Sequence, residues 1–301
     1  MEITTPLELS AEETSLLDMH SVLNVLNAIN YELLQISEEL GSDDHLFELM
    51  GEVNGAADLF RDPDASLQLI QGIETFITRI EQAIDRESEM AGHEAAERII
   101  SHRDNLQNIY TIIRIRAREI ITRFQAPDAW VKHSAERLNG HMVDFLAAVE
   151  KNSHGRYRIV HNVAAKQDGD YLIHFDITSD SGDIIPMPMV FQDVMRDLLA
   201  NARKYTELGG KIQGGLHAGK DELRFVLEDN GMGIPKDSIQ DMVLFGKRAK
   251  NVEGRTTLGG GFGLTKAYFV TRRHNGRMWI DSATKEEGGT GTRIEIRIPV
   301  P

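Results

Sequence analysis

The residues best suited to chemistry lie in three stretches of the C-terminal half of the chain. In the first, Asp197 and Asn201 fall four residues apart, on one face of a stretch whose apolar residues recur at helical spacing. In the second, Asp229 follows an apolar run at 223–227 that predicts a buried strand ending in a tight turn. In the third, glycines at 259–263 open an apolar helix whose N-terminus can accept phosphate. A carboxylate, a carboxamide and phosphate-tolerant glycines together predict a magnesium–nucleotide site.

Each stretch alone has a plainer explanation. Asn201 could be a polar residue on a surface helix, Asp229 part of an ordinary turn, and the glycines a flexible loop. Their order and spacing favour the nucleotide site. The three stretches resemble the N, G1 and G2 boxes in the ATP-binding domain of sensor histidine kinases, a fold shared with type II topoisomerases, MutL and Hsp90. Gly-Thr-Gly-Thr at 289–292 resembles the last glycine box, and the resemblance covers roughly residues 138–301.

This resemblance implies roles for individual residues. Asn201 would supply a carboxamide ligand to Mg²⁺, which prefers oxygen ligands and would take others from phosphate. Lys204 would lie near the phosphates and Tyr205 against the nucleotide. Asp229 resembles the carboxylate that accepts a hydrogen bond from the adenine amino group. The other residues expected at ATP are Gly231 and Gly233 by the adenine, Gly259, Gly261 and Gly263 by the triphosphate, and Thr292 in the last glycine box.

Between the boxes, residues 244–248 resemble the family's F box. Phe245 would anchor a mobile lid over about 246–258, and Lys247 or Arg248 could meet the γ-phosphate. An exposed basic loop is nearly as good an explanation for those two side chains. Asp197 stands where these kinases often carry Asn and ATP-hydrolysing relatives carry a Glu base. It therefore acts either on Mg²⁺ through water or as a base for water, and the sequence leaves both open.

Residues 1–127 contain no convincing strand. Ser10 followed by acids predicts the start of a long helix, in which Leu16, Met19, Leu23, Leu26 and Leu33 fall at heptad a and d positions. A second long helix is predicted over about 94–124, and helices at 45–60 and 65–89 form an insertion at about 42–90. We therefore predict an α plus α/β protein: a helical-bundle dimerisation domain at 1–135, then an α/β-sandwich ATP-binding domain at 136–301.

By the same resemblance, the first long helix carries a phosphorylated histidine. Residues 19–29 resemble the family's H box: His20, Asn24, Leu26 and Ile29 match it, whereas Ser21 and Val25 do not. His20 lies at the rim of the heptad seam, and Asn24 would position water for dephosphorylating a regulator. The acid usually found at position 21 is absent, so slow autophosphorylation is expected. His102 is the rival acceptor, but its d position favours a partly buried bundle histidine.

Composition excludes some partners and compartments. The 301 residues contain no cysteine, so there is neither a disulfide nor a thiolate metal site. The net charge is −14, and residues 1–90 hold twenty Asp and Glu against three Arg and no Lys, giving 3 − 20 = −17. Such a charge disfavours nucleic acid and anionic membranes as partners. No apolar run approaches the ~18 residues of a membrane span, so we expect a cytoplasmic protein.

The function predicted is that of an ATP-dependent protein-histidine kinase of a two-component system. It would autophosphorylate on His20 and pass the phosphoryl group to an aspartate in the receiver domain of a response regulator. We expect a homodimer, because a single helical hairpin leaves the Leu16/Leu23/Leu26 stripe uncovered. The alternatives are an ATP-binding phosphatase or phosphotransfer hub, a non-catalytic dimeric scaffold, and an ATP-driven clamp.

Overall fold

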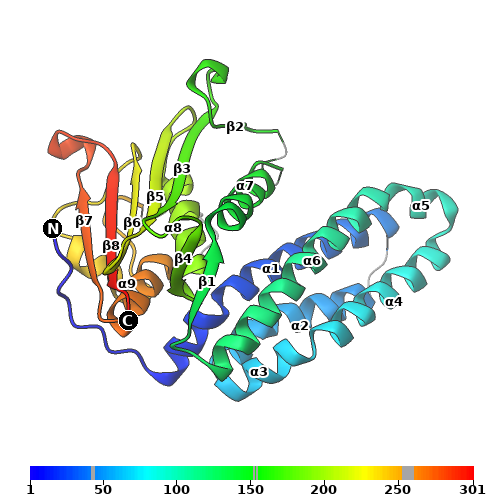
Figure 1. Ribbon diagram of the computed structural model, residues 1–301. Helices are drawn as coiled ribbons and strands as arrows, with labels where there is room; N and C mark the ends of the chain where they lie inside the picture. Colours follow the sequence, from blue (N-terminus) through cyan, green and yellow to red (C-terminus); the bar gives the residue numbers. More distant parts are fainter. Residues whose placement is uncertain (42–44, 152, 154, 253–260) are drawn as a thin grey trace. The chain divides into compact units, whose positions relative to one another are not determined.

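The chain folds as a helical unit, residues 8–127, and an α/β unit that joins residues 1–7 to residues 128–301 (Figure 1). The computed structural model describes the whole chain except residues 42–44, 152, 154 and 253–260. The domain boundary that we predicted at 135/136 falls inside the α/β unit, after the first residue of α7 (Ala135–Lys151), which directly follows β1 (Trp130–Ser134). The first seven residues, which we had placed in the helical domain, belong to the α/β unit.

The helical unit is built from two long antiparallel helices and shorter ones between them. The first long helix begins where its sequence predicts: the Ser10 hydroxyl accepts from the backbone N–H of Glu13, whose side chain accepts from Ser10 N–H in return. The predicted helix at 65–89 is split at Gly72, and the second long helix is preceded by a short one. The helices are α1 (Ala11–Leu40), α2 (His45–Leu59), α3 (Pro63–Gln71), α4 (Ile73–Ala91), α5 (His93–Arg98) and α6 (Ile100–Gln125).

Most of the apolar stripe of α1 is covered within one chain. Met19, Val22, Leu26 and Ile29 are at most 1% exposed, whereas Leu23 is half-buried. The buried residues pack in a bundle in which α1 contacts α6 most extensively and also contacts α2, α3 and α4. The insertion therefore covers part of the surface that we expected a second copy of the chain to cover.

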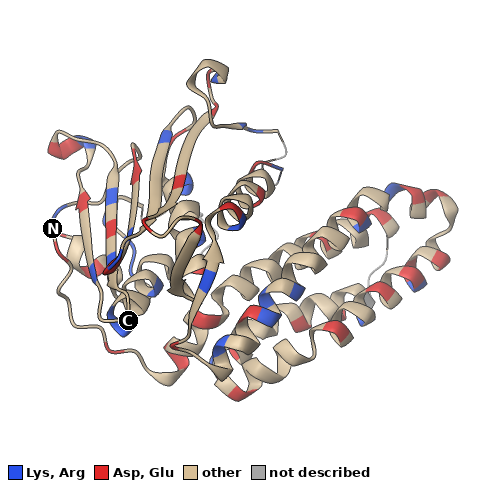
Figure 2. Ribbon diagram, viewed as in Figure 1, with Lys and Arg blue, Asp and Glu red and all other residues tan. Residues whose placement is uncertain are grey.

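Acidic side chains of the insertion pair with arginines of α6. Arg103 lies 2.7 Å from Asp85 and 3.3 Å from Glu81, and Arg114 lies 2.9 Å from Glu74. Figure 2 shows basic and acidic residues distributed along the helices of this unit. Such partly exposed pairs each contribute little to stability. They do place opposite charges on facing helices, which fixes how α4 lies on α6. Part of the acidic excess of residues 1–90 is thus matched inside the helical unit.

The α/β unit contains the predicted sandwich. Its six-stranded sheet has the order β2-β3-β5-β6-β8-β7, parallel from β2 to β5 and antiparallel from β5 to β7. The helices α7, α8 and α9 pack their apolar residues against one face in a common core. The strands are β2 (Ile159–Val160), β3 (Tyr171–Ser179), β5 (Lys211–Ala218), β6 (Glu222–Asp229), β7 (Arg277–Ser282) and β8 (Thr292–Pro299), and the two further helices are α8 (Phe191–Tyr205) and α9 (Gly263–Arg273). A separate two-stranded sheet pairs β1 with β4 (Ile184–Pro188).

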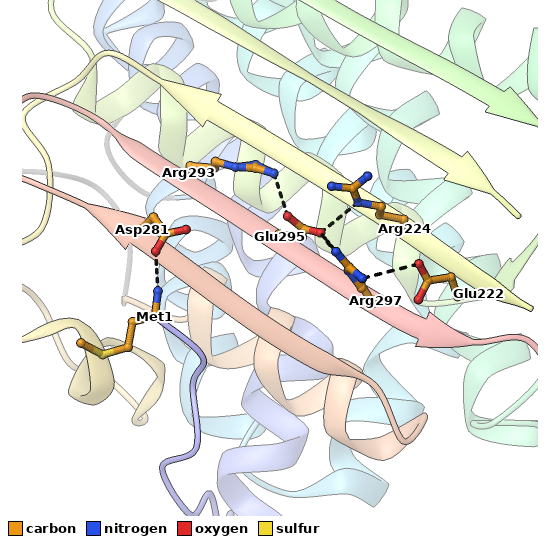
Figure 3. Close-up of polar contacts among 7 residues, drawn as sticks. All are labelled: Met1, Glu222, Arg224, Asp281, Arg293, Glu295 and Arg297. Atoms are coloured by element: carbon orange, nitrogen blue, oxygen red, sulfur yellow. Dashed lines mark hydrogen bonds and ion pairs between the residues drawn. The ribbon is translucent and has the colours of Figure 1, made fainter.

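The other face of the sheet is a lattice of charges. Glu295 on β8 accepts from Arg224 on the neighbouring β6 and from Arg293 and Arg297 on its own strand, at 2.7–2.9 Å (Figure 3). These residues alternate with buried ones along each strand, as expected where one face of a sheet meets water. Because this face is occupied by charge pairs, we look for a ligand site at the helical layer and the ends of the strands.

The N-terminal residues extend the sheet at its β7 edge. Ile3 N–H donates to Met278 O and Ile280 N–H to Met1 O, both at 2.9 Å. The Ile3 side chain is 2% exposed in the core, and the Tyr268 hydroxyl donates to Thr5 O at 3.0 Å. The sequence had given no sign that these residues pair with a strand some 275 positions away.

Candidate nucleotide site and phosphoacceptor helix

The helix α8 presents the N-box residues beside the start of α9. Its apolar residues Val194 and Leu198 are buried in the core, which leaves Asn201 half-buried at the surface of the helical layer. A Cβ on Gly263 would lie 2.4 Å from Asn201 Nδ2, so a larger residue there would displace either this carboxamide or the start of α9. The structure therefore brings together the first and third of the predicted stretches.

Asp229 ends β6 at the adjoining strand edge. Its carboxylate accepts from the Gly231 N–H at 2.8 Å. Burial raises the pKa of Asp229 to about 6. Hydrogen bonds from the backbone N–H groups of Gly231 and Thr292 lower this pKa, and the negative charge of Glu228 raises it further. A carboxylate kept this far from water, at the end of a strand, is suited to accept a hydrogen bond from a ligand.

The G1 turn is held against the C-terminal end of α8. Met232 N–H donates to Tyr205 O at 3.1 Å, and Asn251 Nδ2 donates to Gly233 O at 2.9 Å. Gly233 has φ +73°, and a Cβ there would lie 2.0 Å from Ala283 O, so no other residue fits. The apolar side chains of this region form a small cluster that includes Tyr205, Met232, Ile234, Met242 and Leu264. Such a cluster can provide an apolar wall for a planar base.

Basic side chains gather at the same end of α8. Burial lowers the pKa of Lys204, and the positive charges of Arg248 and Arg203 lower it further. Burial raises the pKa of Tyr205, while the Arg248 charge opposes that shift. Lys204 Nζ lies 5.3 Å from the centre of the Tyr205 ring. Arg248, from the predicted F box, is therefore close to the N-box helix, and the like charges favour an anionic ligand.

The F-box phenylalanine, Phe245, packs against an aromatic ring of the G2 stretch. The rings of Phe245 and Phe262 lie 4.8 Å apart. Lys247 is exposed, and its carbonyl would lie 2.9 Å from a Cβ on Gly261, so the F and G2 boxes are in contact. Gly259 and the last part of the predicted lid, 253–258, lie outside the described residues.

Asp197 faces a buried lysine that sequence reasoning missed. Lys266 Nζ, on α9, lies 3.3 Å from Asp197 Oδ2 and 3.7 Å from Asp193 Oδ2, and the lysine side chain is 2% exposed. The sequence did contain one indication of it: Lys266 is a charged residue within the otherwise largely apolar run 264–270. This contact joins the N-box helix to the G2 helix.

The side chains at the site fit a magnesium nucleotide better than a metal alone. Within the described residues, no group of three or more His, Asp or Glu could hold a metal ion. The Asn201 carboxamide would therefore be one protein oxygen ligand among phosphate oxygens and waters, a set that Mg²⁺ tolerates. Thr292, the last predicted contact, has its hydroxyl 2.9 Å from that of Ser282 and begins the strand opposite Asp229.

The predicted phosphoacceptor stretch lies in the middle of α1, in the helical unit. His20 and Ser21 are half-buried and Asn24 is exposed. The Ser21 hydroxyl oxygen is buried and has no hydrogen-bond partner among the described residues. The serine therefore does not orient the His20 ring through a hydrogen bond.

Comparisons with known proteins relate the C-terminal part of the α/β unit to a family. Residues 188–301 match the family described as "Histidine kinase-, DNA gyrase B-, and HSP90-like ATPase". This stretch is therefore similar to the domains of that family. The adaptive-response sensory kinase SasA of Synechococcus elongatus is 30% identical over 175 residues, which cover 56% of this chain and 41% of that protein. The sensor histidine kinase RppB of Synechocystis is 29% identical over 131 residues, covering 42% and 28%.

The chain is thus related to sensor histidine kinases, and it spans less than half the length of these two relatives. A solved structure of the mycobacterial sensor histidine kinase MprB aligns with 56% of this chain and 97% of its own, at 20% identity and a TM-score of 0.39. Among the described residues, no helix has the length and hydropathy needed to cross a membrane.

Proposed function

We propose that the chain is an ATP-dependent protein-histidine kinase of a two-component system, acting through Mg-ATP on His20 and then on an aspartate of a response regulator. One observation carries the proposal: Asn201, Asp229 and the basic pair Lys204 and Arg248 converge around the C-terminal end of α8. The basic pair suits an anion, Asn201 suits the Mg²⁺ that accompanies it, and Asp229 suits the amino group of a base, as a magnesium nucleotide requires.

The residues would act mainly by positioning. Asp229, ionised, accepts from the adenine amino group, while Lys204 and Arg248 bind phosphate oxygens. Magnesium, held by Asn201 and the phosphates, would offset charge at the β- and γ-phosphates. The imidazole of His20 attacks the γ-phosphorus as the bond to ADP breaks, which is a reaction that depends on alignment and charge more than on covalent help. Asp197, held by Lys266, has a positioning role in joining α8 to α9.

A second candidate is a phosphatase or phosphotransfer hub for the same regulator. Two observations on α1 favour it. The Ser21 hydroxyl has no hydrogen bond among the described residues, and Asn24, about one turn further along the helix, is exposed. A side chain that cannot assist the imidazole slows phosphorylation, whereas an exposed carboxamide near the phosphoaspartate of a docked receiver domain can orient water. Both activities would use the same helix.

Incubation of the full chain with γ-labelled ATP tests the proposal. We expect an acid-labile, base-stable label that is lost in His20→Gln, and transfer of the label to receiver domains supplied as a panel. Binding of ATP with no label, but faster loss of phosphate from a phosphorylated receiver, would favour the phosphatase. Steady ATP turnover without phosphoprotein would indicate a clamp, and absence of nucleotide binding would leave a scaffold.

The predicted homodimer remains part of the proposal. We inferred a dimer from an uncovered Leu16/Leu23/Leu26 stripe on α1; Leu16 and Leu26 are buried within a single chain, whereas Leu23 is half-buried. A dimer would therefore bury the part of the stripe around Leu23 or use another surface. Light scattering at micromolar concentration distinguishes the two states, and a monomer that still labels would place the whole kinase in one chain.

A further inference from the structure

A histidine and a buried glutamate face each other between α6 and α1, in a part of the helical unit that the proposed reaction does not use. His102 Nδ1 lies 2.7 Å from Glu32 Oε2. Asn105 Nδ2 donates to Oε1 of the same carboxylate at 3.3 Å. The Glu32 side chain is 9% exposed and the His102 side chain 24% exposed. A carboxylate so deeply buried is costly unless it is paired, and here both of its oxygens have a partner.

The partner sets the tautomer of the histidine. An ionised carboxylate only accepts hydrogen bonds, so the proton of a neutral His102 ring lies on Nδ1. The lone pair is then on Nε2, the opposite ring nitrogen. This resembles the arrangement of an activated nucleophile: one ring nitrogen is held by a carboxylate, a third group holds the carboxylate, and the lone pair is on the opposite ring nitrogen.

We propose that His102 is a second phosphoacceptor, a role that rests on the proposed kinase function for its phosphoryl donor. The Nε2 lone pair attacks the γ-phosphorus of ATP, and the bond from that phosphorus to the β–γ bridging oxygen breaks. ADP leaves with the electron pair of that bond. The proton stays on Nδ1, shared with Glu32, whose negative charge stabilises the positive charge that develops on the ring.

The site is separate from the H-box stretch. Glu32 and His20 are both on α1 and twelve positions apart, which places them roughly 18 Å apart along the helix axis. Position 21 carries a serine whose hydroxyl is unbonded, while His102 has a carboxylate at hydrogen-bond distance. The chemistry that the sequence lacks beside His20 is therefore present beside His102, supplied by the facing helix.

The simpler alternative is that His102 and Glu32 form an ion pair that only anchors α6 to α1. Two phosphoryl donors distinguish this alternative from the proposal, with the phosphorylated residues of the full chain located by mass spectrometry. Phosphoramidate phosphorylates histidine without an enzyme, and His93, whose side chain is 92% exposed, is the internal control. With this donor we expect faster labelling at His102 than at His93, despite its lower exposure. Glu32→Gln should slow His102 by about tenfold or more and leave His93 unchanged.

Mg-ATP is the second donor, used on His20→Gln so that only other histidines can respond. Label at His102 that is lost in Glu32→Gln supports the proposal. Asn105→Ala, a milder change that leaves the ion pair, should lower the rate by a smaller factor and covers the case in which Glu32→Gln fails to fold. Label confined to His20 in the unmodified chain overturns the second site and leaves the kinase standing.

If ATP labels no histidine, the proposed kinase function fails, and phosphoramidate then decides the question of His102. Preference for His102 over His93 keeps its acceptor role, with another donor. Equal or slower labelling of His102 overturns it and leaves a structural ion pair.

Discussion

Lys266 Nζ lies 3.3 Å from Asp197 Oδ2, and this contact joins α9 to α8. The lysine is almost fully buried and also faces Asp193 at 3.7 Å. A carboxylate beside a buried ammonium group helps to hold the two helices together. We therefore propose a positioning role for Asp197, beside the two roles that the sequence left open.

Replacing Lys266 by Met should destabilise the α/β unit. Breaking a buried pair from one side leaves uncompensated charge and typically costs about 3–5 kcal/mol. We expect a lower midpoint in urea, together with weaker Mg-ATP binding because α8 and α9 lose their register. The double variant Asp197→Asn/Lys266→Met should recover part of the stability. An unchanged midpoint in the single variant would contradict the assignment.

Nucleotide affinity should depend on pH through Asp229. The pKa of its carboxyl group is raised to about 6, and adenine binding uses the ionised form. Affinity should therefore be full above that pH and decrease below it, by up to roughly tenfold per pH unit. Calorimetry with an ATP analogue between pH 5 and pH 8 measures this. Asp229→Asn should bind weakly at every pH, whereas a pH-independent wild type would exclude Asp229 from the adenine site.

Gly263→Ala should act through Asn201. The new methyl group would lie 2.4 Å from Asn201 Nδ2, so either the carboxamide or α9 must move. We expect loss of the Mg-dependent part of ATP binding, as in Asn201→Ala, while adenosine binding is retained. Gly246→Ala is a useful comparison: it has a positive φ but nothing within 4 Å of its Cβ. Equal effects of the two variants would show that general strain is responsible.

Ser21→Glu should accelerate labelling of His20. The serine hydroxyl is buried without a hydrogen bond among the described residues, so it neither orients the ring nor stabilises its developing charge. General acid–base assistance is typically worth ~10²–10⁴-fold, and a gain of about tenfold or more is expected. The rate of acid-labile labelling at saturating ATP measures it. An unchanged rate, with ATP binding intact, would show that position 21 does not limit the chemistry.

Leu26→Ala should destabilise the helical unit by about 2–5 kcal/mol, because a buried leucine leaves a cavity. Since the residue is covered within one chain, the unfolding midpoint should not depend on protein concentration. A midpoint that rises with concentration, in wild type and variant alike, would instead indicate that a second copy completes the bundle.

The elements around the candidate nucleotide site were largely predictable from the sequence, because the residues proposed for the site lie at fixed offsets within short elements. Asp229 ends a strand, and Asn201 lies on a helix of clear periodicity. Lys266 was not predictable, because nothing local indicates that a lysine in an apolar register will meet two carboxylates of another helix. The strand Ile184–Pro188 was missed because its prolines argue against pairing, and it pairs only with β1, in a sheet of two strands.

The helical unit shows a different limit. The heptad pattern of α1 correctly indicated a buried seam, but a seam does not reveal which helices cover it. The arginines of α6 and the acids of α4 carried that information as complementary charge, and it could be recognised only once the helices were placed side by side. His102 was correctly expected to be partly buried, and Glu32, seventy positions away, could not be matched to it from sequence.

The strand formed by the first residues also determines how the chain would respond to cleavage. The helical unit leaves the α/β unit after residue 7 and returns at residue 128, so it is an insertion with two covalent connections. A proteolytic cut near residue 127 would give a helical fragment that carries Ile3 and its neighbours, paired along β7. The two fragments should stay associated by strand addition until denatured. A fragment beginning at 128 and made alone would instead expose the β7 edge and an unfilled pocket for Ile3, and it should aggregate or bind a peptide of residues 1–7.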